Sequence, residues 1–320
     1  MPLKGTIKRI PGVETLWRNL RPLPEARPEP LPTATDYPSP IAGRADTNEC
    51  IRSLLESSRP GLCSRLGANE LNCVSHYLTR CRQSLPEPYP EELCYRMQTN
   101  AGFFPTNDEC LDAFAREYLT AFRPSDIMGV WLIAGEDRFV REQCPSATLV
   151  TPGDLSAPYF HNLPWSAALQ GKRVLVIHPF AESISEQYTR NRERLWDDPD
   201  VLPAFDLQVI KAVQSIGGEP TEFATWFDAL NDMKVRMDAL DFDVCLVGAG
   251  AYGPSLAAHA KRIGKKGVVL GGGVQILFGI RGKRWDERED FAGFFNDYWV
   301  RAKPSEVPRN ARAVEDGCYW

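Results

Sequence analysis

The hydrophobic and polar positions in the second half of the chain follow two alternating periods. Short apolar runs, as in buried strands, occupy residues 173–178, 207–213, 244–247 and 267–270. Between them, apolar residues recur every three or four positions, in 181–195 and from Phe223 to Leu240, which predicts helices with one buried face. This alternation predicts an α/β fold that is Rossmann-like, with a mostly parallel sheet and helices on both faces.

The first half of the chain carries fewer strand signals. We expect helices at 46–57 and 68–81, strands at 62–66 and 127–132, and a helix that Asn107 and Asp108 cap. That last helix shows a continuous apolar stripe from Leu111 to Phe122. Near the end of the chain, ring positions predict one more amphipathic helix, through Phe291, Phe294, Phe295, Tyr298 and Trp299.

Prolines divide the chain into two parts. Seven of them crowd the stretch from Pro22 to Pro40, and such a segment neither pairs into a sheet nor continues a helix. Residues 1–44 are therefore predicted to form an extended arm, partly disordered or lying over the body. Residues 45–320 are predicted to form one domain.

Composition excludes several classes of protein. The net charge of −5 gives no basic face for nucleic acid, and no apolar run reaches the length of a membrane span. The first residues lack the apolar core of a signal peptide, so we expect a cytoplasmic protein. The nine cysteines contain no C-x-x-C pair, so free thiols are expected rather than a zinc site.

A glycine motif is the strongest chemical signal. Residues 248–253 read Gly-Ala-Gly-Ala-Tyr-Gly, after a strand and before a helix that Pro254 can begin. Such a turn lets the backbone approach a phosphate at a helix N-terminus. An NAD-dependent oxidoreductase is one interpretation, but the next strand ends in Gly271-Gly272-Gly273 without the acidic residue that binds the ribose. A tight turn without any ligand is the other alternative.

Two further strand ends carry chemistry. The first continues as Arg65-Leu66-Gly67-Ala68-Asn69-Glu70, and another as His178-Pro179-Phe180-Ala181-Glu182. In a parallel sheet these ends and both glycine turns would face one cleft, suited to an anionic ligand with a metal or a general base nearby. Each residue also has a structural alternative. Arg65 could pair with a structural carboxylate, and His178 could form a hydrogen bond with the backbone of a turn. Glu70 and Glu182 could simply interact favourably with the dipole of a helix in its first turn.

These segments together resemble bacterial glycosyltransferases of the GT-D fold. The 65–70 stretch is similar to that family's R-[FL]-G-D-G-E-like motif, although Ala68 stands at the aspartate position. His178-Pro179-Phe180, the 248–253 turn, the 271–273 glycines and the stretch from Gln275 to Trp285 also resemble its pattern. The resemblance covers roughly residues 45–320.

The resemblance implies transfer of a sugar from a nucleotide-sugar donor to an acceptor glycan, in the synthesis of a surface or capsular polysaccharide. It also implies a divalent metal, Mn²⁺ or Mg²⁺, of whose D-x-E ligands only Glu70 remains here. A non-catalytic sugar-nucleotide or polysaccharide binding protein is the alternative that Ala68 favours. Candidates for catalysis are Glu70, His178 and Glu182, and those for donor binding are Arg65, Gly67, Asn69, Gly248, Gly250, Tyr252, Gly253, Gly271, Gly272 and Gln275.

Overall fold

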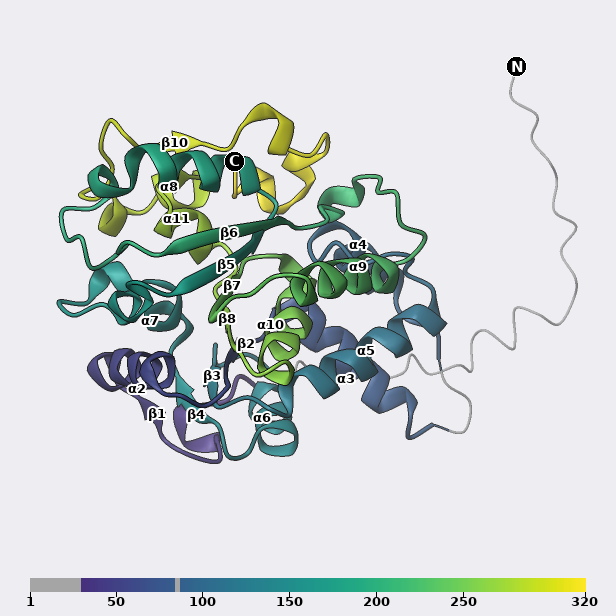
Figure 1. The fold of residues 1–320 in the computed structure, drawn as a ribbon. Helices are drawn as coiled ribbons and strands as arrows, with labels where there is room; N and C mark the ends of the chain where they lie inside the picture. Colours follow the sequence, from purple (N-terminus) through teal and green to yellow (C-terminus); the bar gives the residue numbers. More distant parts are fainter. Residues whose placement is uncertain (1–29, 84–86) are drawn as a thin grey trace, which may run out of the picture. The chain divides into compact units, whose positions relative to one another are not determined.

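Eight parallel strands form the central sheet of this computed structural model, which describes residues 30–83 and 87–320 (Figure 1). Their order across the sheet is β1-β4-β3-β2-β8-β7-β5-β6. The α/β, Rossmann-like prediction is therefore confirmed, and every pairing in the sheet is parallel. The strands are β1 (Ile41–Ala42), β2 (Gly61–Arg65), β3 (Ile127–Gly129), β4 (Thr148–Val150), β5 (Arg173–His178), β6 (Asp206–Lys211), β7 (Val244–Val247) and β8 (Lys266–Val269).

Alternating side chains in the strands explain why helices cover both faces. In β5, Leu175 and Ile177 enter one hydrophobic core, whereas Val174 and Val176 enter the other. Figure 1 shows α3, α5, α9 and α10 on one side of the strands and α2, α7, α8 and α11 on the other. The bounds are α2 (Arg44–Glu56), α3 (Ala68–Arg80), α4 (Glu91–Thr99), α5 (Asp108–Phe122), α6 (Glu136–Gln143), α7 (Pro152–Ser156), α8 (Ala181–Leu195), α9 (Trp226–Asp238), α10 (Gly253–Arg262), α11 (Gly273–Leu277) and α12 (Lys283–Asp286).

Local sequence signals account for several helix ends. The Asn107 side chain accepts the N–H of Cys110, so it caps α5 as predicted, and the Leu111–Phe122 stripe is buried. Pro254 lies in the first turn of α10. Helix α2 begins at Arg44, two residues before the predicted start, and α9 begins only at Trp226, where Thr225 caps it.

The predicted helix through residues 291–299 is wrong. Phe291 ends a short 3-10 helix (Glu289–Phe291), and turns lead from there to β10 (Val300–Arg301), which pairs with β9 (Ile280–Arg281). Asn296 closes one turn by accepting the N–H of Tyr298, which competes with helical hydrogen bonds. Phe291 and Trp299 are nevertheless buried in the core, and Phe294 and Phe295 pack against it, whereas Tyr298 is exposed. The spacing therefore reflects rings packed from turns rather than a helix.

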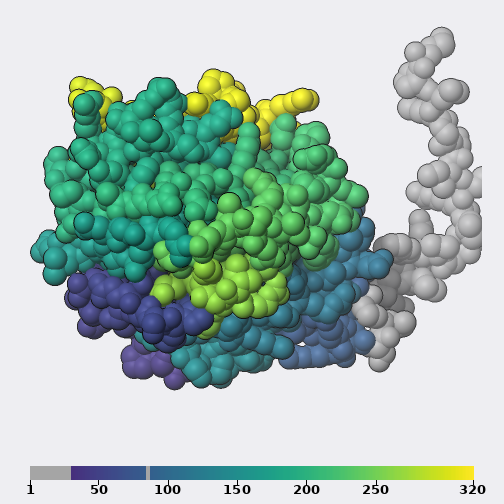
Figure 2. All heavy atoms as spheres, viewed as in Figure 1, coloured from purple at the N-terminus to yellow at the C-terminus, as the bar shows by residue number. Residues whose placement is uncertain are grey.

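The segments at the two ends of the predicted domain contribute to its body. Ile41 and Ala42, which the sequence analysis placed in the proline-rich arm, pair with β4 as the edge strand. Residues 1–29 of that arm lie outside the described residues. The last residues (yellow) lie beside α8 (teal) at the upper edge of Figure 2. Across the described part of the chain, no helix has the length and apolarity to cross a membrane.

We predict that Gly267→Ala destabilises the fold by about 1–3 kcal/mol, the usual cost of overpacking. A Cβ at this β8 position would lie 2.2 Å from the Ala257 carbonyl oxygen, so α10 would have to move off the sheet. Thermal unfolding measures the effect, with Gly153→Ala as the control because a Cβ there meets nothing within 4 Å. Equal melting temperatures for the two variants would contradict this account of the α10 packing.

Candidate functional site

Four adjacent strands, β2, β8, β7 and β5, end at one cavity of about 230 Å³. This agrees with the rule that ligands of open parallel sheets bind at the carboxyl ends of strands. The sequence analysis named thirteen candidate residues, and the structure brings ten of them to the cavity wall. These are Arg65, Gly67, Asn69, Glu70, His178, Gly248, Gly250, Gly271, Gly272 and Gln275.

Arg65, the last residue of β2, places its guanidinium in the cavity wall. Its Nη1 donates to the Ser156 hydroxyl at 2.8 Å, and its Cζ lies 5.2 Å from the ring centroid of Trp131. It forms no ion pair with a carboxylate of the described residues, so the structural alternative of such a pair is not observed. Burial lowers the pKa of the guanidinium, yet an arginine stays charged in proteins. The site therefore holds a half-buried positive charge that lacks a paired anion among the described residues.

Glu70 lies in the first turn of α3 and is buried beside Gly67. A Cβ at residue 67 would lie 2.0 Å from Glu70 Oε2, so the carboxylate rests against the glycine. Burial raises the pKa of the Glu70 carboxyl, and the charge of Arg65 partly opposes that shift. A carboxyl group whose pKa is raised is a better proton acceptor than an exposed one once it ionises.

His178 ends β5 as a neutral donor rather than a base. The backbone N–H of Phe180 donates to His178 Nδ1 at 3.0 Å, which leaves the ring proton on Nε2. Burial lowers the pKa of the imidazole to about 3. Transfer of a proton from a substrate to His178 is therefore unfavourable at neutral pH, which argues against the predicted role of His178 as a base. Its Nε2–H can still donate to a ligand.

The two glycine turns approach one another where β7 and β8 end. A Cβ at Gly248 would lie 2.5 Å from the Gly271 carbonyl oxygen and 2.6 Å from His178 Cδ2. Gly250 and Gly271 have φ angles of 51° and 56°, a region that favours glycine. A Cβ at Gly271 would also lie 2.5 Å from Arg65 Nη2, so this glycine leaves room for the guanidinium.

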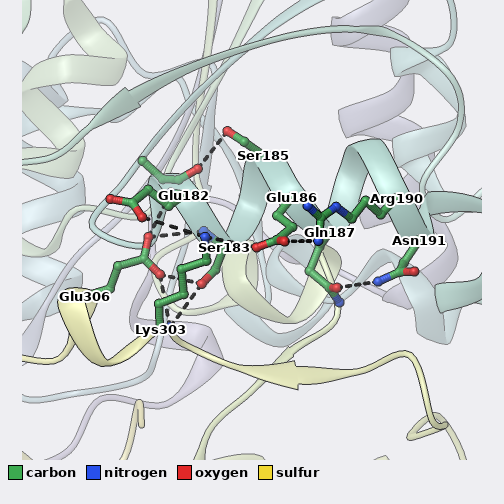
Figure 3. Close-up of polar contacts among 10 residues, drawn as sticks. Glu182, Ser183, Ser185, Glu186, Gln187, Arg190, Asn191, Lys303 and Glu306 are labelled. Carbon is green, nitrogen blue, oxygen red and sulfur yellow. Dashed lines mark hydrogen bonds and ion pairs between the residues drawn. The ribbon is translucent and has the colours of Figure 1, made fainter.

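Glu182 does not line the cavity, so the structure does not support its predicted catalytic role. Its carboxylate is about half exposed and lies 3.7 Å from Lys303 Nζ (Figure 3). Figure 3 also shows Glu306 at the start of α8, where its Oε1 accepts the N–H groups of Glu182 and Ser183 at 2.8 and 3.2 Å. The buried Glu306 carboxylate thus occupies the anion position at this helix N-terminus, which a phosphate would otherwise favour.

Tyr252 and Gly253 also lie outside the cavity wall. The Tyr252 ring stacks on Trp226 with centroids 4.8 Å apart, and its hydroxyl lies 3.4 Å from that of Ser215. A Cβ at Gly253 would lie 3.2 Å from Val269 Cγ1, so this glycine allows α10 to pack closely on β8. The third glycine of the motif therefore serves packing, while the first two face the cavity.

The segment 311–320 supplies a wall that sequence reasoning missed. Glu315, Tyr319 and Trp320 line the cavity. The backbone N–H of Arg284 donates to the Cys318 carbonyl at 2.9 Å, and Arg284 Cζ lies 4.8 Å from the Tyr319 ring centroid. Arg284, in the stretch from Gln275 to Trp285, thus holds this segment, and no local pattern in the sequence indicates that contact.

Gln275 has an orientation fixed by its neighbours. Its Nε2 donates to the carbonyls of Ile280 and Tyr319 at 3.3 and 3.1 Å. The opposite orientation of the amide would place Oε1 against these two carbonyl oxygens, which are also acceptors. Its Oε1 is buried and has no hydrogen-bond partner. Gln275 therefore connects the 271–273 glycine turn to the segment 311–320.

The cavity residues do not fit a divalent metal site. Glu70 and Glu315 are the two carboxylates in its wall, and Arg284 pairs with Glu315. Nowhere in residues 30–83 and 87–320 do three His, Cys, Asp or Glu side chains gather as metal ligands. Ala68 offers no ligand at the position where the resembled family has aspartate, so the side chains of this wall leave a divalent ion short of oxygen ligands.

A comparison of the chain with known protein families, with curated proteins and with solved structures finds no match.

We predict that Glu70→Gln raises the melting temperature at pH 7.5 and has no such effect at pH 4. The folded-state pKa of Glu70 is raised, so ionisation costs stability above the unfolded pKa, and that cost vanishes at acid pH, where both states are protonated. Thermal unfolding at the two pH values measures the difference. Glu109→Gln is the control because Glu109 is exposed in the first turn of α5 and favours the helix dipole. A lower melting temperature for Glu70→Gln at pH 7.5 would contradict the assignment.

His178 gives a second prediction. Because its folded-state pKa is about 3, the ring should remain neutral, with its proton on Nε2, from pH 8 to pH 5. The same depressed pKa means that His178 lowers stability as the pH falls below about 6.5, the pKa of a free imidazole. NMR of ¹⁵N-labelled imidazoles reports both the tautomer and the titration. Protonation of His178 above pH 5 in the folded protein would show that the ring is less buried than described.

Proposed function

We propose that this protein is a glycosyltransferase that moves a sugar from a nucleotide-sugar donor to an acceptor glycan, in the synthesis of a surface or capsular polysaccharide. One observation carries the proposal. The half-buried Arg65 guanidinium, which has no paired carboxylate among the described residues, shares a cavity with two glycine turns and the buried Glu70 carboxyl. The resemblance of these segments to GT-D glycosyltransferases gives the reaction class.

The donor diphosphate fits beside Arg65 and the glycine turns. Departure of the nucleoside diphosphate builds negative charge on its phosphate oxygens. A guanidinium and oriented N–H groups in a low-dielectric cavity stabilise that charge without rearranging. The Nε2–H of His178 is a further neutral donor in the same wall. The N-terminus of α8 is not used, because Glu306 occupies it.

Glu70 is the proposed base. The acceptor hydroxyl must lose its proton as it attacks the sugar, and a carboxylate within hydrogen-bond reach can take that proton. Glu182 lies outside the cavity, and His178 already holds its proton on Nε2. Of the three catalytic candidates from the sequence, Glu70 alone thus combines a place in the cavity wall with a free lone pair.

A non-catalytic binding protein for sugar nucleotides or polysaccharide is the second candidate. The observation that favours it is the lack of a group of metal ligands among the described residues. Ala68 stands where the resembled motif has an aspartate, so Glu70 has no acidic neighbour there. Turnover separates the two candidates. A transferase hydrolyses or transfers at least one donor from a broad panel, and loses most of that rate in Glu70→Gln.

We predict that Gly250→Val weakens nucleotide-sugar binding at least tenfold, because a side chain at this turn blocks the approach of the phosphate. The assay is a thermal-shift titration with UDP, UDP-glucose and GDP-mannose, with and without Mn²⁺. Gly264→Val is the matched control. Its φ angle of 84° strains valine in the same way, but Gly264 lies beyond the opposite end of α10, where a Cβ would meet nothing within 4 Å.

Each outcome of this titration has one meaning. Binding that is lost in Gly250→Val and kept in Gly264→Val supports the phosphate site at the turn. Equal binding in both variants contradicts that site. Binding of NAD by the wild-type protein, without any response to nucleotide sugars, would favour the oxidoreductase alternative.

A further inference from the structure

Trp131 is a half-exposed indole two residues beyond the end of β3, the strand that pairs with β2. Its Nε1–H donates to the Leu66 carbonyl at 3.0 Å, and Arg65 Cζ lies 5.2 Å from the centroid of its ring. Leu66 and Arg65 both line the cavity. The indole therefore contacts two residues of the cavity wall, while 45% of Trp131 stays exposed.

The backbone around Trp131 is held in a strained conformation. Leu132 has a φ angle of 61°, which is unfavourable for a leucine. The N–H groups of Trp131 and Leu132 each donate to Glu136 Oε2 at 2.8 Å, and the Tyr37 hydroxyl donates to the same oxygen at 2.7 Å. Strained residues that buried polar groups keep in place gather at binding and catalytic sites.

We propose that the exposed face of Trp131 binds the acceptor glycan by stacking against the C–H face of one sugar ring. This proposal rests on the proposed function, since it supplies the second substrate of the same cavity. The face of an indole carries negative charge and attracts polarised C–H groups, and the large ring loses little freedom on binding. A sugar on this platform would lie beside Arg65 and Leu66, two residues of the cavity wall.

The size of the exposed surface favours a sugar over a protein partner. Trp131 and the neighbouring Leu132, 37% exposed, are the large exposed apolar residues of this loop. A stable protein interface buries about 800 Å² on each partner, far more than these two side chains offer. One ring matches the area of one pyranose, and its attachment to Leu66 and Arg65 keeps it rigid.

The test uses Trp131→Ala and two comparison variants in the full chain. Trp131→Phe keeps an aromatic face but loses the bond to Leu66. Tyr298→Ala removes a comparably exposed ring (41%) that lies over Arg194 and away from the cavity. The probes are methyl glucosides, galactosides and mannosides, detected by shifts of backbone amide NMR signals in every variant and of ¹⁵N-indole signals where Trp131 is present, and UDP, detected by thermal shift. The Trp131 indole signal is assigned as the one missing in Trp131→Phe.

We expect at least one glycoside to shift the Trp131 indole signal. Binding of that glycoside should weaken at least tenfold in Trp131→Ala, recover most of its strength in Trp131→Phe and stay unchanged in Tyr298→Ala, while UDP binding stays within twofold. The proposal is overturned if no glycoside shifts this signal, or if Trp131→Ala binds glycosides normally. It is also overturned if UDP binding falls as much as glycoside binding, because Trp131 would then only support Arg65. Glycoside binding at Trp131 without UDP binding would support the platform and contradict the proposed function.

Discussion

The close approach of β5, β7 and β8 at Gly248 is the constraint on which the site depends. The α carbon of this residue lies so near the Gly271 carbonyl and the His178 ring that a Cβ would come within about 2.6 Å of both. Three strand ends can meet there only because residue 248 has no side chain. Their meeting brings both glycine turns and His178 to one cavity, to which the end of β2 adds Arg65 and the first turn of α3 adds Glu70.

The charged groups of the cavity, the buried Glu70 and the half-buried Arg65, weaken the fold while they suit a ligand. Burial disfavours the ionised Glu70, and it removes water from Arg65 without supplying a paired carboxylate. An anionic ligand would supply that missing partner for Arg65. His178 avoids the same cost by staying neutral. This combination is typical of a binding site, where the ligand rather than the protein completes the electrostatic balance.

Much of the fold and part of the site could be predicted from the sequence because both depend on local patterns. The strand run 244–247, the glycine turn after it and Pro254 identify one strand end, and parallel pairing then places the other ends beside it. The segment 311–320 and Trp131 could not be found in this way, because both reach the cavity through contacts distant in sequence, such as Arg284 with Tyr319. The aromatic spacing of residues 291–299 led to a wrong helix prediction because turns on the surface can also place rings every three or four positions and pack most of them on the core.

Helices α8 and α10, two of the helices that begin at this edge of the sheet, carry opposite arrangements at their N-termini, and the difference restricts where an anion can bind. Helix α8 already has the Glu306 carboxylate on its first N–H groups, so a second anion there would meet a negative charge in a buried setting. The N-terminus of α10 follows the glycine turn, which lines the same cavity as Arg65, and has no carboxylate in its first turn. In the proposed reaction, electrostatics would therefore favour a phosphate group at the β7–α10 turn rather than at α8. An acceptor hydroxyl near Glu70 would then approach from the β2–β3 side, where Trp131 lies.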